Sequence, residues 1–312
     1  MTTRYSCLAK FSPLLLVVYF LFLARNQVYY ERLLTSLSIT FDDFPSDYAA
    51  ALVEAQKENK NPDYNWPPVI VPEPSAQTSI PPSIHFIWFP NLYHEHLDIS
   101  QIPAIGSDAP EICQQHNPSF NIQIWNATAA RALLETHYEW FLPIYDSYRY
   151  PIQRVDAFKY FVLWHYGGVY MDLDIECRCS LDPLLPFPAW FPKANPLGVN
   201  NDLMATRARH PLTHLMLKGL SPRNRSLVFP YLTIFWSTGP QFTSDMLKKW
   251  ALRLAGSTAY VPGTRKADAH PDAVFVLPRD FYSEKYTFFG HSPGGTWHGE
   301  DVAIVLWLVA RP

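Results

Sequence analysis

Two aspartates, Asp172 and Asp174, lie one residue apart in the segment Val169–Glu176, where apolar residues occupy every other position. Side chains in a β-strand point alternately to opposite faces. We therefore expect a strand with the apolar residues on a buried face and Tyr170, both aspartates and Glu176 on the other face. Carboxylates this close repel each other unless a cation joins them, and a hard divalent ion with oxygen ligands is the natural partner. The spacing predicts a metal site that binds a diphosphate and offsets the charge that builds on it as a bond breaks.

A second pair of charged residues precedes the aspartates. Asp156 and Lys159 are three residues apart in the segment Pro151–Tyr166, which starts with proline and is followed by Gly167-Gly168, the asymmetry expected of a helix. Residues three apart share a helix face, so this pair is either an ordinary surface ion pair or part of the same site. An isolated Asp-x-Asp is most often a solvated strand end, and the spacing alone leaves that alternative open.

The rest of the chain alternates strands with helices. We predict strands at 84–89, 121–125 and 274–277. We predict helices that begin near Ala129, after the turn Ser237–Pro240, and at Asp301. This alternation indicates an α/β layered domain.

The N-terminal segment differs from the rest of the chain. Residues 11–24 are almost wholly apolar, but as a helix they would span only about 21 Å, against a hydrocarbon core of roughly 30 Å. No small-residue cleavage site follows, so we interpret residues 1–25 as an uncleaved signal anchor, with a signal peptide or a buried helix as the alternatives. Seven prolines between residues 61 and 82 indicate a stiff stem. We therefore divide the chain into the anchor 1–25, a stem 26–82 and a catalytic domain 83–312.

Composition limits the classes of function. The net charge of −3 argues against a nucleic-acid partner, and four cysteines are too few for a disulfide scaffold. A disulfide among Cys113, Cys177 and Cys179 is compatible with an oxidising compartment, and the sequence leaves the pairing open. Sequons at Asn126 and Asn224 would be glycosylated only if the domain faces a lumen.

The block around the aspartates resembles a known family. Arg154-Val155-Asp156-Ala157-Phe158-Lys159-Tyr160 and the following Gly167-Gly168-Val169-Tyr170-Met171-Asp172-Leu173-Asp174 are similar to the Asp-x-Asp glycosyltransferases of family 32, typified by fungal α-1,6-mannosyltransferase. The resemblance runs from about Ile84 to Asp301. The stretches most similar to the catalytic chain of inositol phosphoceramide mannosyltransferase are 198–204, 230–233, 237–240 and 295–301.

This resemblance implies a GT-A type, Rossmann-like nucleotide-sugar-binding domain, a GDP-mannose donor and retention of configuration at the anomeric carbon. It also implies a divalent cation, Mn²⁺ or alternatively Mg²⁺, held by Asp174 and His298. Asp172 and Asp174 would be the catalytic residues. The residues that would bind the donor are Trp88, Asp156, Lys159, Tyr170, Asp172 and Trp297. The residues that would contact acceptor or donor are Asn201, Asp202 and Asp301.

Some of these assignments have plainer alternatives. Trp88 and Trp297 could simply fill the core, and His298 could be an ordinary hydrogen-bonded histidine. Relatives often carry Arg where this chain has Lys159, and lysine binds phosphate as a point charge rather than a planar fork. The affinity or specificity for the donor could therefore differ from that of the relatives.

The resulting hypothesis is a mannosyltransferase that acts on inositol phosphoceramide. It would be a single-pass Golgi membrane protein with its catalytic domain in the lumen and a separate membrane regulatory subunit as partner. The alternatives are an N-glycan α-1,6-mannosyltransferase of the same family and a catalytically silent, donor-binding regulatory subunit. The intact Asp156, Asp172 and Asp174 argue against the silent subunit. The apolar run 302–309 is expected to pack on the domain or to lie at the membrane surface.

Overall fold

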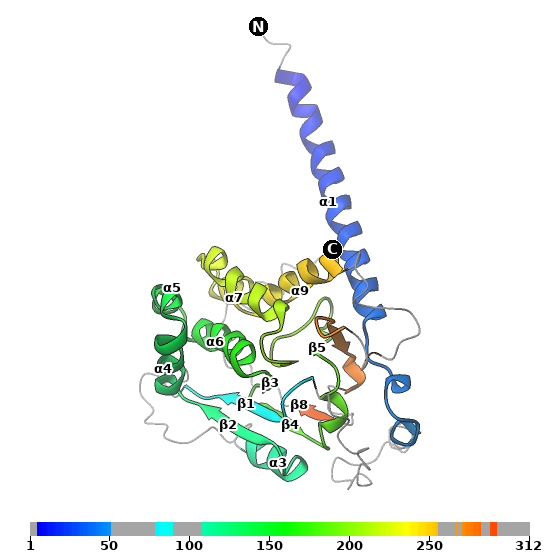
Figure 1. Cartoon of the computed structure of the whole chain (residues 1–312). Helices are drawn as coiled ribbons and strands as arrows, with labels where there is room; N and C mark the ends of the chain where they lie inside the picture. The colour runs from blue at the N-terminus through cyan, green and yellow to red at the C-terminus, as the bar shows by residue number, and fades with distance from the viewer. Residues whose placement is uncertain are drawn as a thin grey trace.

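The computed structural model describes residues 5–50, 79–89, 108–254, 266, 270–281 and 288–291, with the backbone alone for residues 5–14, 254, 280 and 291. These residues form a mixed α/β domain from which one long helix projects (Figure 1). The predicted α/β class is confirmed. Trp297, His298, Asp301 and the run 302–309 lie outside the described residues, as does the proline-rich segment up to residue 78.

A six-stranded sheet forms the centre of the domain. In spatial order its strands are β2 (Asn121–Trp125), β1 (Ser83–Ile87), β3 (Gly168–Met171), β6 (Leu203–Thr206), β5 (Ala189–Pro192) and β7 (Phe275–Leu277). β6 runs antiparallel to both of its neighbours, and the other adjacent strands are parallel. A two-stranded sheet pairs β4 (Ile175–Cys177) with β8 (Phe289–His291).

The helices are α1 (Tyr5–Ser36), α3 (Ala109–His116), α4 (Ala127–His137), α5 (Leu142–Ser147), α6 (Pro151–Tyr166), α7 (Pro211–Arg223), α8 (Pro230–Ser237) and α9 (Pro240–Leu254). Side chains that alternate along the strands divide the core into two clusters. One cluster joins Tyr170 and Met204 to residues of α4, α6, α7 and α9. The other joins Val169 and Met171 to α3, β4 and β8. Tyr170 therefore faces the helical side of the sheet, as the alternation predicts.

Two predicted elements match the structure at both ends, the helix Pro151–Tyr166 and the strand Asn121–Trp125. The predicted continuous strand Val169–Glu176 is wrong. β3 ends at Met171, the chain turns through Asp172 and Asp174, and β4 joins the second sheet. The Asp172 N–H donates to the carbonyl of Asp202 at 2.7 Å, and the Ile175 N–H donates to the carbonyl of Asp172 at 3.1 Å. Because these bonds bend the chain, the aspartates lie on a turn rather than along a flat strand.

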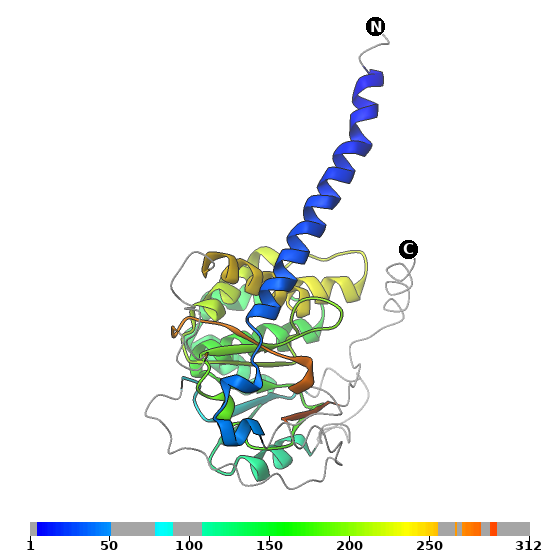
Figure 2. The same ribbon diagram turned by 90° about the vertical axis from the view of Figure 1, so that its right-hand side faces the viewer.

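The last turns of α1 and the residues that follow pack on the domain. Tyr30 and Leu34 belong to the helical-side core, whereas Ile39 and Phe44 belong to the core on the opposite face of the sheet. Between them the chain forms a bridge to β7, where the Ile39 N–H donates to the carbonyl of Val276 at 2.8 Å. The N-terminal half of α1 projects away from the domain in both views (Figures 1 and 2). In the part of the chain that the structure describes, no helix is both long enough and apolar enough to span a bilayer.

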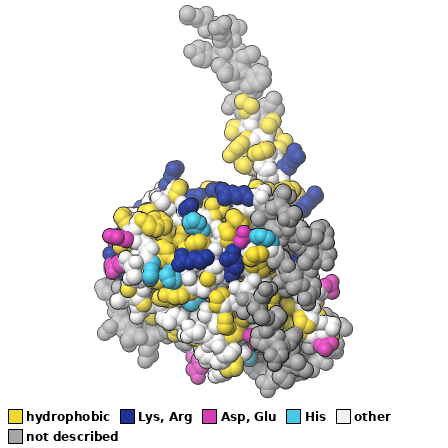
Figure 3. Space-filling model, in the orientation of Figure 1, with side chains coloured by type: hydrophobic (Ala, Val, Ile, Leu, Met, Phe, Trp, Pro, Cys, Tyr) yellow, Lys and Arg dark blue, Asp and Glu magenta, His cyan; other side chains and the backbone are white. Residues whose placement is uncertain are grey.

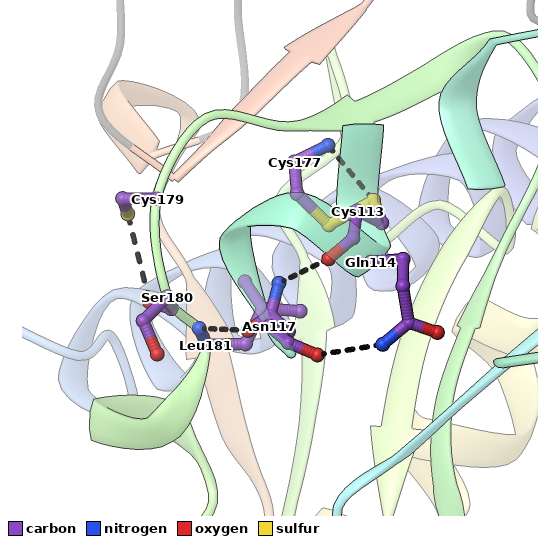
Figure 4. The surroundings of a disulfide bond; sticks show 7 residues. All are labelled: Cys113, Gln114, Asn117, Cys177, Cys179, Ser180 and Leu181. Atoms are coloured by element: carbon purple, nitrogen blue, oxygen red, sulfur yellow. Dashed lines mark hydrogen bonds between the residues drawn. A yellow bond between two sulfur atoms is a disulfide. The ribbon is translucent and has the colours of Figure 1, made fainter. Parts of the chain in front are cut away.

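A disulfide between Cys113 and Cys177 joins α3 to β4 (Figure 4). Asn117 reinforces this connection because its amide donates to the carbonyl of Cys113 at 3.0 Å and accepts from the N–H of Leu181 at 2.7 Å. Cys179 is a buried free thiol, which resolves the pairing that the sequence left open. The disulfide fixes the strand that directly follows the aspartate turn.

Candidate active site

Helix α6 carries Asp156 and Lys159 into the interior. The helix begins with Pro151, ends at Tyr166 and is followed by Gly167, whose φ of 70° lies in the left-handed region that glycine adopts without strain. Asp156 is only 5% exposed and Lys159 only 2%. The alternative of an ordinary surface ion pair is therefore wrong, and both charges face the carboxyl end of β3.

The Lys159 ammonium bridges three elements. Its Nζ lies 2.9 Å from Asp156 Oδ1 on its own helix and 3.2 Å from Asp172 Oδ1 after β3. It also donates to the carbonyl of Asn201, at 3.2 Å, in the loop before β6. The Tyr170 ring lies beneath it, with 4.9 Å between Nζ and the ring centroid, and the Tyr170 hydroxyl donates to Asp172 Oδ1 at 2.5 Å. The sequence-predicted Asp156, Lys159, Tyr170, Asp172 and Asn201 thus form one cluster.

Asp156 is held by a second set of contacts that the sequence reasoning did not assign. Asn201 Nδ2 donates to its Oδ1, and Thr238 Oγ1 donates to its Oδ2, each at 3.1 Å. The buried Tyr160 hydroxyl donates to the carbonyl of Thr238 at 2.5 Å, and its oxygen lies 2.8 Å from Thr243 Oγ1. Thr238 lies in the stretch 237–240, which resembles the inositol phosphoceramide mannosyltransferases. The sequence therefore pointed to this stretch, but it did not show that Thr238 bonds to Asp156.

The cluster holds more negative than positive charge. Burial alone would lower the pKa of Lys159, but the facing carboxylates of Asp172 and Asp156 hold it well above its usual value. Burial raises the pKa of Asp156 even though Lys159 opposes the shift. Burial likewise raises the pKa of Asp172, and the nearby charge of Asp174 adds to that effect. One ammonium therefore stabilises two carboxylates, and a further cation would be favourable beside them.

The turn itself is the more open part of the cluster. The Asp172 side chain is 35% exposed, against 3% for the Lys159 side chain that contacts it. Among the described residues no group of three His, Cys, Asp or Glu side chains could hold a metal ion. Mg²⁺ and similar hard ions are commonly bound by one or two carboxylates together with substrate phosphates, so the Asp172–Asp174 turn fits that donor set.

The loop before β6 connects this cluster to α1. The Gly198 N–H donates to Glu31 Oε1 at 2.9 Å, and Lys193 forms an ion pair with the same carboxylate. Asn201 and Asp202, which both contact the residues around Asp172, follow within four residues of Gly198. The end of α1 therefore holds the loop that supplies one wall of the site.

Trp88 follows β1 at the same edge of the sheet as the aspartate turn. β1 and β3 are parallel with His85 opposite Tyr170, so extending this register places the residues after both strands side by side. Trp88 is 7% exposed, and its backbone N–H donates to the carbonyl of Trp125 at 2.8 Å. This location agrees with either of its two predicted roles, and stacking on a nucleotide base stays a prediction.

The two sequon asparagines have structural partners. Asn126 is exposed and caps α4, where its Oδ1 accepts from the N–H of Ala129 at 2.8 Å. Asn224 ends α7, and its Nδ2 donates to Ser147 Oγ at 2.7 Å. Glycosylation of either residue stays a prediction.

A comparison with known protein families gives the class of protein. Residues 106–190 match the family described as "Glycosyltransferase sugar-binding region containing DXD motif", and this range includes Asp156, Lys159 and the aspartate turn. The solved structure of PaToxG glycosyltransferase aligns with a TM-score of 0.43 and 16% identity over 57% of this chain and 72% of that chain.

The particular family follows from curated relatives. Inositol phosphoceramide mannosyltransferase 1 of Schizosaccharomyces pombe is 34% identical over 239 residues, which cover 75% of this chain and 69% of that protein. Inositol phosphoceramide mannosyltransferase 2 of the same organism is 34% identical over 70% of this chain and 61% of its own length. The chain belongs to this family of DXD glycosyltransferases. It spans about 60% of the length of the first curated relatives that it matches.

Proposed function

We propose that the protein is a retaining mannosyltransferase that transfers mannose from GDP-mannose to inositol phosphoceramide. The observation that carries this proposal is the cluster in which Lys159 joins Asp156 to Asp172 beside the exposed turn. The intact Asp156, Asp172 and Asp174 argue against a silent donor-binding subunit. The family membership supports the sugar and the class of acceptor.

Asp174, with His298, would hold a divalent cation, Mn²⁺ or alternatively Mg²⁺. The bound ion would neutralise the charge that develops on the departing diphosphate. Trp88 would stack on the nucleotide base, and Trp297 and His298 would close the site over the diphosphate. Tyr170 and Asp172 would contact the ribose or sugar of the donor. Asp156 and Lys159 would hold the sugar and phosphate side of the donor, while Asn201, Asp202 and Asp301 would contact donor or acceptor.

Hydrogen bonds within the protein occupy both oxygens of Asp156 and one oxygen of Asp172. Asp156 is 5% exposed and receives bonds on both oxygens, and Asp172 Oδ1 is bonded by Lys159 and Tyr170. We therefore propose that the acceptor hydroxyl itself attacks on the face from which the diphosphate leaves and gives its proton to the departing diphosphate, which retains the configuration. The mixed sheet with one reversed strand is compatible with the GT-A type of fold that we propose for the domain.

We further propose that residues 1–25 anchor the protein in the Golgi membrane with the domain in the lumen. Nine consecutive side chains of α1, Leu15–Leu23, are 43–64% exposed, and a helix that is apolar all round needs an apolar environment. The Cys113–Cys177 disulfide supports an oxidising compartment. Glycosylation at Asn126 or Asn224 and a separate membrane regulatory subunit belong to the same proposal.

A screen of donors and acceptors tests the function. Purified full-length protein is incubated with Mn²⁺, a panel of nucleotide sugars and either inositol phosphoceramide in detergent or free oligomannose, and the products are weighed by mass spectrometry. We expect a lipid product with one added hexose when the donor is GDP-mannose, and no such product with the other nucleotide sugars of the panel. Transfer to oligomannose with none to the lipid would favour the N-glycan alternative and contradict the proposed acceptor.

A further inference from the structure

The charge of the domain is unevenly distributed. The segment 211–254, which forms α7, α8 and α9, contains six basic residues and one acidic residue, although the whole chain carries a net charge of −3. The six basic residues are Lys218, Arg223, Arg225, Lys248, Lys249 and Arg253. The one acidic residue, Asp245, pairs with Arg223 at 2.5 Å. These helices therefore contain no further carboxylate to balance the other five basic residues.

Four of the basic side chains, Lys218, Arg225, Lys249 and Arg253, are exposed. Exposed apolar side chains lie on the same segments: Leu227 (40%), Val228 (90%), Trp236 (49%) and Leu252 (49%). We call these eight residues the basic face. Figure 3 shows Lys and Arg side chains gathered across the end of the domain from which α1 projects. Cations mixed with aromatic and aliphatic side chains are typical of surfaces that lie against anionic lipid headgroups.

The position of the basic face relative to α1 also supports contact with anionic lipid headgroups. α9 contacts the base of α1, since the Tyr30 hydroxyl donates to the carbonyl of Ser244 at 3.0 Å and Lys248 Nζ lies 5.3 Å from the Tyr30 ring centroid. α1 is helical without a break from Tyr5 to Ser36. The exposed apolar stretch of α1 therefore connects rigidly to the domain.

The distance from the apolar stretch of α1 to the domain is short enough for the domain to contact the lipid headgroups directly. From residue 24, the end of the apolar stretch, to Tyr30 is six residues, about 9 Å along a helix. The headgroup layer on each side of a bilayer is roughly 5–8 Å thick. If the apolar stretch lies in the hydrocarbon, the α7 and α9 end of the domain is held at the headgroups.

We infer that the basic face binds an anionic membrane surface and seats the domain on it. This inference rests in part on the proposed membrane anchor, but its test reads the face directly. Each exposed cation is expected to contribute roughly five-fold to binding at low ionic strength. The contributions should add up and should weaken in salt, since exposed charges are screened. The seated domain would present its site to an acceptor that is itself an anionic lipid.

An environment-sensitive NBD fluorophore at Val228→Cys tests the inference. The full chain carries Cys7→Ser, because Cys179 is buried and the other two cysteines form the disulfide. The protein is reconstituted into vesicles of phosphatidylcholine with or without phosphatidylinositol. We expect a blue shift and quenching by brominated lipid in the phosphatidylinositol vesicles, and a smaller effect in phosphatidylcholine alone. The same fluorophore at Gln115→Cys, exposed on α3 at the opposite end of the domain, should respond in neither (Figures 1 and 2).

A charge variant completes the test. Changing Lys218, Arg225, Lys249 and Arg253 together to Gln should abolish the response to phosphatidylinositol. Changing the exposed Arg149 and Arg279 to Gln should not change it. A response at residue 228 that is equal in both lipids, or that appears without lipid as the protein concentration rises, would overturn the inference; the latter result would indicate self-association. Because the readout is fluorescence, it stands whether or not the protein transfers mannose.

Discussion

Lys159 and Lys249 are the same residue type in opposite surroundings. Lys159 is 2% exposed and contacts two carboxylates, a carbonyl and an aromatic ring. Lys249 lies on the exposed basic face, where the one acidic residue of the segment 211–254, Asp245, already pairs with Arg223. The buried ammonium has one geometry and fixed partners, whereas the exposed one acts through its charge alone. Substitutions in the buried cluster should therefore have large effects that depend on geometry. Substitutions on the basic face should have small effects that high salt removes.

The largest effect is expected for Asp172→Asn. Removing one preorganised electrostatic contact at a reacting centre, such as an oxyanion-hole donor, lowers the rate by about 10²–10³, and we expect a loss of this order here. The fold should survive, because the raised pKa of Asp172 means that its charge is unfavourable where it lies. Initial rates of mannose transfer and thermal melting check both parts. An unchanged rate of mannose transfer would contradict a catalytic role for Asp172.

Lys159→Met should be the most destabilising change. It leaves Asp156 buried without its ammonium partner, and breaking a buried ion pair costs about 3–5 kcal/mol. The double variant Asp156→Asn with Lys159→Met removes the stranded charge and should recover part of this loss in chemical denaturation. A cost below about 1 kcal/mol for the single variant would contradict the buried network and make Lys159 resemble the exposed lysines.

The buried, neutral His85 allows the effect of burial to be tested through the pH dependence of stability. His85 is 3% exposed, its Nε2 donates to the carbonyl of Gly167 at 2.9 Å, and burial lowers its pKa to about 4. The unfolded chain binds this proton near pH 6.5, so stability should fall as pH drops from about 6.5 towards 4. The loss for this residue should be about 2 kcal/mol at pH 5. Denaturation of wild type and His85→Gln at pH 7 and pH 5 checks this, and the pH-dependent loss should shrink in the variant.

The contact between α1 and the loop before β6 should have an intermediate effect. Glu31→Ala removes the ion pair with Lys193 and the bond from Gly198, with an expected cost of about 1–3 kcal/mol. Because the same loop carries Asn201, the KM for the donor should also rise a few-fold. Glu31→Gln keeps an acceptor for Gly198 and should fall between Ala and wild type. An unchanged KM in Glu31→Ala would show that the loop does not need α1.

The smallest effect is expected on the basic face. A single Lys249→Gln change should lower transfer to a lipid acceptor in anionic vesicles by less than about five-fold. The difference should vanish in high salt, while hydrolysis of GDP-mannose stays unchanged. A loss that persists in high salt would indicate a specific contact and would break the contrast with Lys159.

Local sequence signals predicted the elements that depend on local chemistry. Proline at the start and glycine at the end fixed the bounds of α6, and hydrophobic alternation assigned Tyr170 and Val169 to opposite faces. The break after Met171 was missed because it depends on the bond from Asp172 to Asp202, a contact between distant residues. The roles of Thr238 and Tyr160 were missed for the same reason. Lys159 was assigned to the site, but the sequence could not show that it bridges two carboxylates.

The most direct test measures transfer by Asp174→Ala and by wild type with and without a metal chelator. The full-length proteins receive GDP-mannose and inositol phosphoceramide in detergent, and the mannosylated lipid is counted by mass spectrometry. We predict that the variant and the chelated wild type both lose transfer, that Mn²⁺ restores only the wild type, and that both proteins melt at similar temperatures. Full transfer by Asp174→Ala, or by wild type in excess chelator, would contradict a metal-dependent reaction at the aspartate turn.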